Sequence, residues 1–108
     1  MLRVTVFELT GDFGPGFAYR TDQCASYLLN DSNASFGTAV YGDAFVKWAG
    51  EGHAPRSEVG AFLQNIVKST LSVAADKGIV VELVSEEVVE VTDDWVRTAT
   101  RRVDVDAV

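Results

Sequence analysis

Cysteine, histidine and proline are scarce in this sequence of 108 residues, which has one Cys, one His and two Pro. A single cysteine excludes a disulfide framework. A metal site built from Cys and His needs three or four such ligands, and only Cys24 and His53 are present. The same shortage argues against a Cys–His dyad and a Ser–His–Asp triad. We therefore expect no metal, no catalytic residues and no cofactor.

Basic residues are also few, with nine Lys and Arg against sixteen Asp and Glu, a net charge of −7. This balance argues against direct binding of nucleic acid, which requires clustered Lys and Arg. No apolar run approaches the roughly 20 residues of a membrane-spanning helix, and the alternating segment Met1–Glu8 does not resemble a signal peptide. The sequence predicts a cytoplasmic protein that does not bind membranes.

Hydrophobic residues make up 47% of the chain and charged residues 23%, as in ordinary folded domains. Together with the length, this composition predicts a single domain over residues 1–108. The predicted fold class is α+β. We expect a small antiparallel sheet, formed by an N-terminal meander and one or two later strands, packed by one long amphipathic helix, with a short C-terminal helix as an option.

The N-terminal half is rich in aromatic side chains, since nine of the eleven lie in the first 48 residues. Aromatic and β-branched residues favour strands. The strands predicted for the meander are Leu2–Leu9, Phe17–Arg20, Ala25–Asn30 and Phe36–Tyr41. After them, Asp43–Ala49 fits a short helix better than an extension of the fourth strand.

A glycine-rich segment, Gly11-x-x-Gly14-x-Gly16, follows the first predicted strand. It lacks the Gly-Lys-Ser end of a Walker loop, and the order of its glycines is opposite to that of a dinucleotide fingerprint. The residues after it do not resemble the start of a helix. We therefore predict a hairpin turn.

The clearest element is an amphipathic helix of about twenty residues, with Ser57 as its cap and Gly78 just beyond its end. Its apolar stripe has helical spacing and comprises Val59, Phe62, Leu63, Ile66, Val67, Leu71 and Ala74. We expect this stripe to be buried against strand residues near Val4, Val6, Val81 and Leu83.

The C-terminal third begins with a predicted strand, Ile79–Val84, and then allows two interpretations. In the first, Val88–Val91 is a strand and Thr92 caps a helix through Arg102. In the second, one helix begins at Glu86. Three valines within four residues favour the strand, because β-branched side chains lose freedom in helices. The tail Val103–Asp106 is either an edge strand or a frayed end.

Six acidic residues and no basic residue lie between positions 82 and 94, before the basic Arg97, Arg101 and Arg102. A helix would pair Asp93 with Arg97 at i,i+4. A continuous strand would place Glu82, Glu86 and Glu90 on one face, where a basic partner would relieve their repulsion. The predicted partner-binding residues are therefore Glu82, Glu86, Glu87, Glu90, Asp93 and Asp94.

These observations favour a non-enzymatic, acidic protein-binding module. Its concrete form is an inhibitor or immunity/antitoxin-type protein of a bacterium or phage, acting on a basic nuclease or nucleic-acid-binding protein. A second hypothesis is a small-ligand-binding protein or enzyme with a sheet–helix cleft. Its polar groups would be Tyr19, Asp22, His53 and Arg56. A third is a structural homo-oligomer subunit. Independently, the apolar content predicts a homodimer, centred on the edge strand Val88–Val91 or on the long helix.

Overall fold

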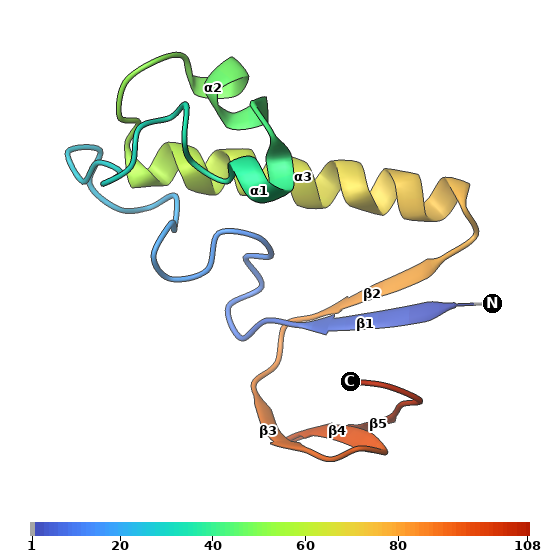
Figure 1. The fold of residues 1–108 in the computed structure, drawn as a ribbon. Helices are drawn as coiled ribbons and strands as arrows, with labels where there is room; N and C mark the ends of the chain where they lie inside the picture. The colour runs from blue at the N-terminus through green and yellow to red at the C-terminus, as the bar shows by residue number, and fades with distance from the viewer. Residues whose placement is uncertain (1) are drawn as a thin grey trace. The chain divides into compact units, whose positions relative to one another are not determined.

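The computed structural model describes residues 2–108 and confirms the α+β class (Figure 1). Its elements in order are β1 (Arg3–Phe7), α1 (Thr38–Tyr41), α2 (Ala44–Ala49), α3 (Arg56–Asp76), β2 (Val80–Val84), β3 (Val88–Val91), β4 (Trp95–Thr98) and β5 (Arg102–Asp104). The chain divides into two compact units. The sheet unit contains the residues up to Asp12 and Leu71–Val108, and the helical unit is Phe13–Thr70. The single domain over residues 1–108 stays a prediction.

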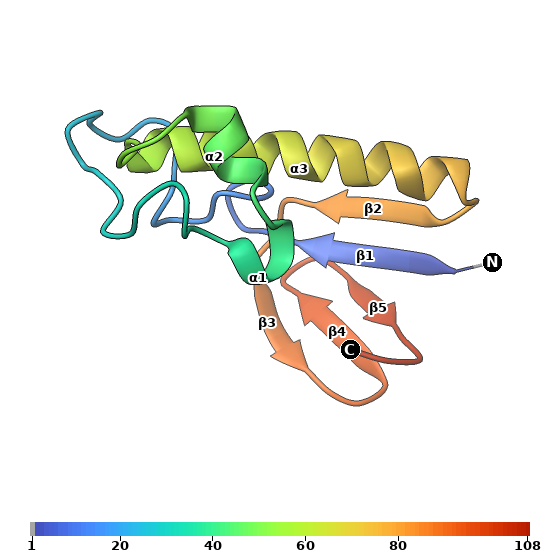
Figure 2. The same cartoon turned by 45° about the horizontal axis from the view of Figure 1, so that its top comes forward.

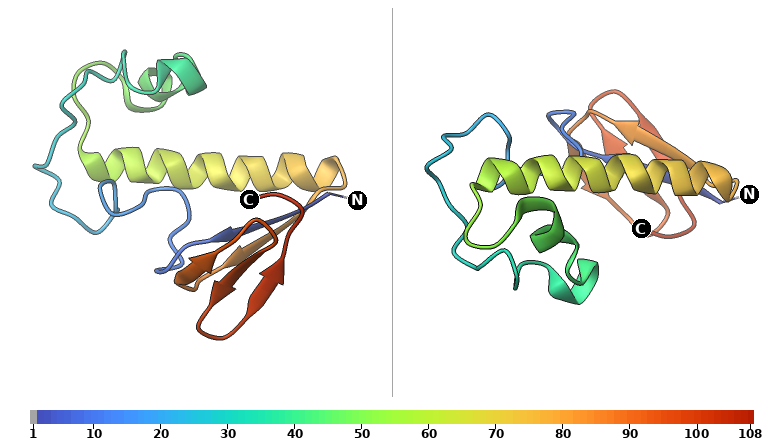
Figure 3. Two further views of the ribbon diagram at one scale, coloured as in Figure 1. Left: turned by 60° about the horizontal axis from the view of Figure 1, so that its bottom comes forward. Right: turned by 90° about the horizontal axis from the view of Figure 1, so that it is seen from above.

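The long helix is present as α3, a continuous helix of 21 residues (Figure 3). It begins at Arg56, one residue before the predicted cap Ser57, and Gly78 after its end has the positive φ of 71° that the sequence suggested. Val59, Phe62 and Ala74 on its apolar stripe are buried. Within residues 2–108, no helix has the combined length and apolar character that crossing a membrane requires.

The core of the helical unit forms around Phe62, which is 3% exposed. Its ring makes edge contacts with Tyr41, Phe45 and Trp48 at centroid distances of 5.5, 5.1 and 5.9 Å. Aromatic pairs prefer this edge-to-face geometry. These aromatic neighbours of Phe62 come from α1 and α2. The expected burial of the stripe against strand residues near Val4 and Val81 stays a prediction.

The predicted N-terminal antiparallel meander is wrong beyond its first strand. Residues 17–20 and 25–30 form turns and loops, with one isolated bridge between Leu28 and Pro55, and residues 36–41 end in the short helix α1. The physical reason is that Tyr19, Phe36 and Tyr41 pack against the core around α2 and α3, so they need no pleated surface. The short helix expected at Asp43–Ala49 is confirmed as α2, although the Asp43 side chain makes no capping hydrogen bond.

Glycine permits a close approach inside the helical unit. A Cβ at Gly60 of α3 would lie 1.9 Å from the Tyr19 carbonyl oxygen. No other residue fits here without movement of the backbone. The loop that the sequence suggested as a second strand therefore lies directly against α3.

In the sheet unit, β1 pairs with β2 in parallel, with Arg3 opposite Val80 and Phe7 opposite Val84 (Figure 2). Parallel strands need a long crossover, usually through a helix, and α3 lies in the segment that connects them. The first strand is thus confirmed, but its partner is parallel and distant in sequence. A hairpin after Gly11–Gly16 is consequently wrong, although Gly11 and Gly16 adopt the positive φ typical of turns.

The remaining strands form an antiparallel sheet in the order β3-β4-β5 (Figure 2). The strand at Val88–Val91 is confirmed, and the C-terminal helix through Arg102 is wrong. Thr92 was expected to cap that helix, and its Oγ1 instead accepts hydrogen bonds from the backbone N–H groups of Asp94 and Trp95 in the β3–β4 turn. The capping chemistry is the same, but β-branched residues on both sides favour a hairpin. The tail contributes the edge strand β5.

Candidate functional site at the carboxyl end of the parallel pair

The carboxyl ends of β1 and β2 lie next to each other and bring two loops together. The N–H of Glu8, directly after β1, donates to the Val84 carbonyl at 3.0 Å. A Cβ at Gly11 would lie 2.9 Å from Oγ of Ser85, the first residue after β2. In open sheets containing parallel strands, ligands bind outside the carboxyl ends of the strands. This edge is therefore the candidate ligand-binding site of the sheet unit.

Glu8 presents a fixed carboxylate at this edge. Its Oε2 accepts hydrogen bonds from Thr10 Oγ1 at 2.7 Å and from the Asp12 N–H at 3.1 Å. The Thr10 hydroxyl, followed by backbone N–H groups of the same turn, lowers the pKa of Glu8 below its ordinary value. Gly11, with φ of 83°, allows the turn that brings these donors back onto the carboxylate. Glu8 is therefore a held anion at neutral pH.

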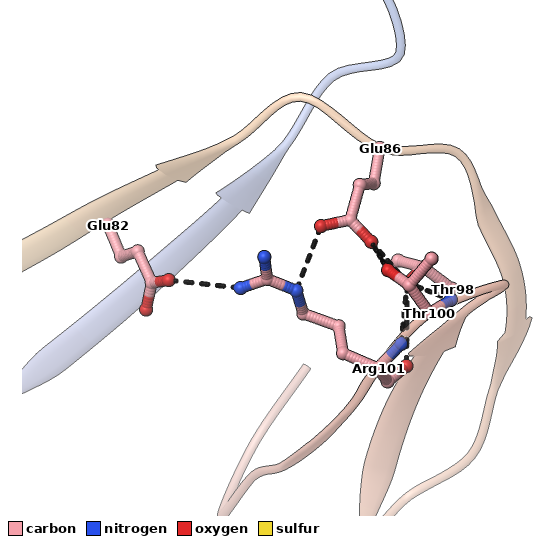
Figure 4. A network of polar contacts seen from close by, with 5 residues as sticks. All are labelled: Glu82, Glu86, Thr98, Thr100 and Arg101. Carbon is pink, nitrogen blue, oxygen red and sulfur yellow. Dashed lines mark hydrogen bonds and ion pairs between the residues drawn. The ribbon is translucent and has the colours of Figure 1, made fainter.

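Three of the six acids predicted to bind a partner form ion pairs within the sheet unit. Glu82 on β2 and Glu86 in the β2–β3 loop both pair with Arg101, at 3.3 and 2.8 Å (Figure 4). Glu90 on β3 pairs with Arg97 of β4 at 3.3 Å, across the antiparallel register. The i,i+4 pair between Asp93 and Arg97 is therefore wrong, since no helix forms there.

The acidic residues do not share one strand face either. Residues 85–87 interrupt the strand, so Glu82 and Glu90 belong to different sheets. Glu86 accepts hydrogen bonds from the hydroxyls of Thr98, at 2.6 Å, and Thr100 (Figure 4). The hydrogen bond from the Thr100 hydroxyl has the largest effect in lowering the pKa of Glu86. The Thr98 hydroxyl and the nearby Arg101 lower this pKa further. The other three acids, Glu87, Asp93 and Asp94, are exposed in loops. Partner binding by the six residues stays a prediction from the sequence.

The single cysteine and single histidine have separate local partners. Cys24 is exposed, and its Sγ lies 2.9 Å from Ser26 Oγ, a hydrogen bond that lowers the pKa of the thiol. His53 Nδ1 lies 3.1 Å from the Leu29 carbonyl oxygen. Within residues 2–108, no three His, Cys, Asp or Glu side chains are arranged to hold a metal ion.

Comparison with known proteins gives a family. The family described as FAD-NAD(P)-binding matches residues 1–108, the whole sequence. The chain belongs to this family. No curated protein and no solved structure matches it.

Membership of the FAD-NAD(P)-binding family corrects the predicted function. It indicates a domain that binds a redox cofactor, and it overturns the acidic inhibitor or immunity/antitoxin-type module. The prediction failed because net charge and a run of acids describe a surface, whereas three of those acids serve internal ion pairs. Charge is evidence about solubility and association rather than about a fold's ligand.

The residues present fit one part of a dinucleotide. In dinucleotide-binding folds, an acid about 20 residues after the glycine fingerprint accepts hydrogen bonds from a ribose hydroxyl. Glu8 is an acid directly after a strand, although it comes before the glycines in the sequence. The pyrophosphate fingerprint G-x-G-x-x-G does not occur in the sequence, and residues 13–19 after β1 form turns rather than the start of a helix. The chain thus offers a carboxylate acceptor for a ribose but no pyrophosphate loop of this kind. Glu8 was not among the site residues expected from the sequence, because the predicted strand Leu2–Leu9 contained it, whereas β1 ends at Phe7.

Proposed function

We propose that this chain binds a flavin or nicotinamide dinucleotide, with the Glu8 carboxylate accepting hydrogen bonds from a ribose. The observation that carries the proposal is the position of Glu8 at the carboxyl end of β1, held by Thr10 and the Asp12 N–H. Membership of the FAD-NAD(P)-binding family supports the ligand class. Such a cofactor, when bound, supplies hydride transfer. We therefore also propose that the protein acts as an oxidoreductase.

The charge of Glu8 also predicts which cofactor binds better. The carboxylate is ionised at neutral pH, and its hydrogen bonds lower its pKa further below the ordinary value. An anion next to the ribose accepts from hydroxyl groups but repels a 2′-phosphate. We therefore expect FAD or NAD to bind more tightly than NADP.

Equilibrium titration with NAD, NADP and FAD, followed by calorimetry or by flavin fluorescence, tests this proposal. Glu8→Gln keeps the shape but removes the charge. It should weaken binding of NAD or FAD roughly tenfold, the equivalent of one charge-assisted hydrogen bond, and should reduce the discrimination against NADP. Glu87→Gln, which removes an exposed loop acid of the same unit, is the matched control. Equal affinities for the wild-type protein and Glu8→Gln would exclude Glu8 as the ribose acceptor.

A further inference from the structure

The helical unit contains an open pocket that the proposed ribose site does not use. Its volume is about 340 Å³, and it is lined by Gln23, Ser26, Tyr27, Leu28 and Arg56. Backbone pairing holds its two sides together, because the Arg56 N–H donates to the Tyr27 carbonyl at 2.7 Å and Leu28 bridges to Pro55. The pocket therefore belongs to one unit and has a fixed frame.

Arg56 is the charged group of this pocket. Its Nε donates to the Leu28 carbonyl at 3.2 Å, which orients the guanidinium. Arg56 takes part in none of the ion pairs found within residues 2–108. By contrast, Arg20 and Arg101 are each paired with an acidic side chain. The outer nitrogens of a guanidinium form a planar fork that matches the oxygens of phosphate or carboxylate. The pocket thus has a positive group, held in place, in a protein of net charge −7.

Several other polar groups of this region already have partners. Gln23 uses its amide nitrogen to donate to the carbonyls of Ala18 and Arg20. The N–H groups of Arg56 and Glu58 at the start of α3 donate to the Tyr27 and Pro55 carbonyls. The Arg56 guanidinium is therefore the charged donor that the pocket offers to an anion.

Beside this cation lie two exposed apolar surfaces, Tyr27 (58% exposed) and Leu28 (49% exposed). A ligand that carries both an anionic group and a flat aromatic ring would use the guanidinium and these surfaces together. Flavin and nicotinamide dinucleotides, the ligands after which the family is described, carry aromatic rings linked to phosphates through ribityl or ribose groups. This favours phosphate over carboxylate as the anion.

We propose that the pocket lined by Tyr27 and Arg56 binds the phosphate group of an aromatic phosphate ester, with the phosphate on the Arg56 guanidinium and the ring on Tyr27. The proposal does not depend on Glu8. It can be tested with phenyl phosphate, which has no ribose for Glu8 to bind. A negative result at the Arg56 pocket would therefore leave the proposed ribose site at Glu8 untouched, and the reverse also holds.

The experiment titrates the whole chain with phenyl phosphate, inorganic phosphate and benzoate, and follows backbone amide and arginine Nε–H resonances. Phenyl phosphate should shift the signals of Ser26, Leu28 and Arg56 saturably and should bind more tightly than the other two probes. Arg56→Gln should weaken it roughly tenfold or more, as expected for loss of a charge-assisted pair. The matched control is Lys68→Gln, which removes an exposed charge from the same helix and should leave the affinity unchanged.

Two further variants separate the parts of the pocket. Arg56→Lys keeps the charge but loses the planar fork, so it should recover only part of the affinity. Tyr27→Leu should remove the preference for phenyl phosphate over inorganic phosphate. The spectra themselves report whether each variant is folded. Equal affinities for benzoate and phenyl phosphate, equal effects of Arg56→Gln and Lys68→Gln, or the absence of saturable shifts would each overturn the proposal.

Discussion

At the scale of single residues, Phe62 shows how one side chain organises the helical unit. It is nearly fully buried, and its neighbours Tyr41, Phe45 and Trp48 all meet it edge-on. The indole N–H of Trp48 also donates to Glu58 Oε1 at 2.7 Å, which keeps the polar end of this ring satisfied at the surface. An apolar core and a polar anchor therefore fix α2 against α3.

Truncation of this ring should be costly. We expect Phe62→Ala to lower the free energy of unfolding by about 3–5 kcal/mol, because the transfer energy is lost and a cavity remains between three rings. Urea denaturation followed by circular dichroism measures this change. Val73→Ala removes a side chain that is 52% exposed on the same helix and should cost less than about 1 kcal/mol. Similar losses for both variants would contradict the assigned core.

At the scale of elements, Glu86 links the β2–β3 loop to the turn between β4 and β5. Its carboxylate accepts from Thr98 and Thr100 and pairs with Arg101, which also reaches Glu82 on β2 (Figure 4). One loop acid thus connects the parallel pair with the antiparallel sheet inside the sheet unit. A run of acids in the sequence turns out to include the acceptors of a polar network.

This network predicts how stability depends on pH. Because folding lowers the pKa of Glu86 below its ordinary value of 4.5, its contribution is complete above that value and is lost as the pH falls through the lower, folded-state pKa. Glu86→Gln should therefore lower the urea midpoint at pH 7 and flatten its decline below about pH 4.5.

The matched control is Glu87→Gln, which changes the neighbouring exposed acid and should alter neither the midpoint nor its pH dependence. Denaturation curves at neutral and acidic pH provide the comparison. A midpoint at pH 7 that is the same for Glu86→Gln and the wild-type protein would argue against this role for the network.

At the scale of the whole molecule, exposed strand edges bear on association. The order β3-β4-β5 leaves β3 at an edge of its sheet, and Val89 and Val91 on it are 49% and 53% exposed. Such an edge offers unpaired backbone groups and an apolar surface to another chain. The homodimer centred on this strand, expected from the sequence, stays a prediction.

Sedimentation over a range of concentrations tests that prediction. A dimer paired through β3 should dissociate in Val89→Lys, since a charge on an edge strand opposes strand addition. Val73→Lys, which adds the same charge at an exposed position of α3, should leave the dimer intact. A wild-type protein that remains monomeric at high micromolar concentration would reject the homodimer.

The sequence by itself determined the elements whose signals are local. The periodic stripe and Gly78 predicted α3, and β-branched runs predicted β2 and β3, because side-chain periodicity and backbone preference depend only on near neighbours. Asp43–Ala49 was assigned correctly for the same reason. Of the polar groups named from the sequence, Arg56 lines the pocket described above. It lies at the start of α3, one residue before the predicted cap Ser57.

Only the tertiary structure decided what depends on distant pairing. The parallel register of β1 with β2 places Glu8 at the carboxyl edge, yet the partner strand lies beyond α3 in the sequence. Likewise, Glu82 and Glu86 face Arg101 only because the β4–β5 hairpin returns to them. Aromatic residues favour strands by local preference, but they can also fill a helix-packed core. Which of these forms is settled by the surfaces that the rest of the chain offers, and local sequence does not encode those surfaces.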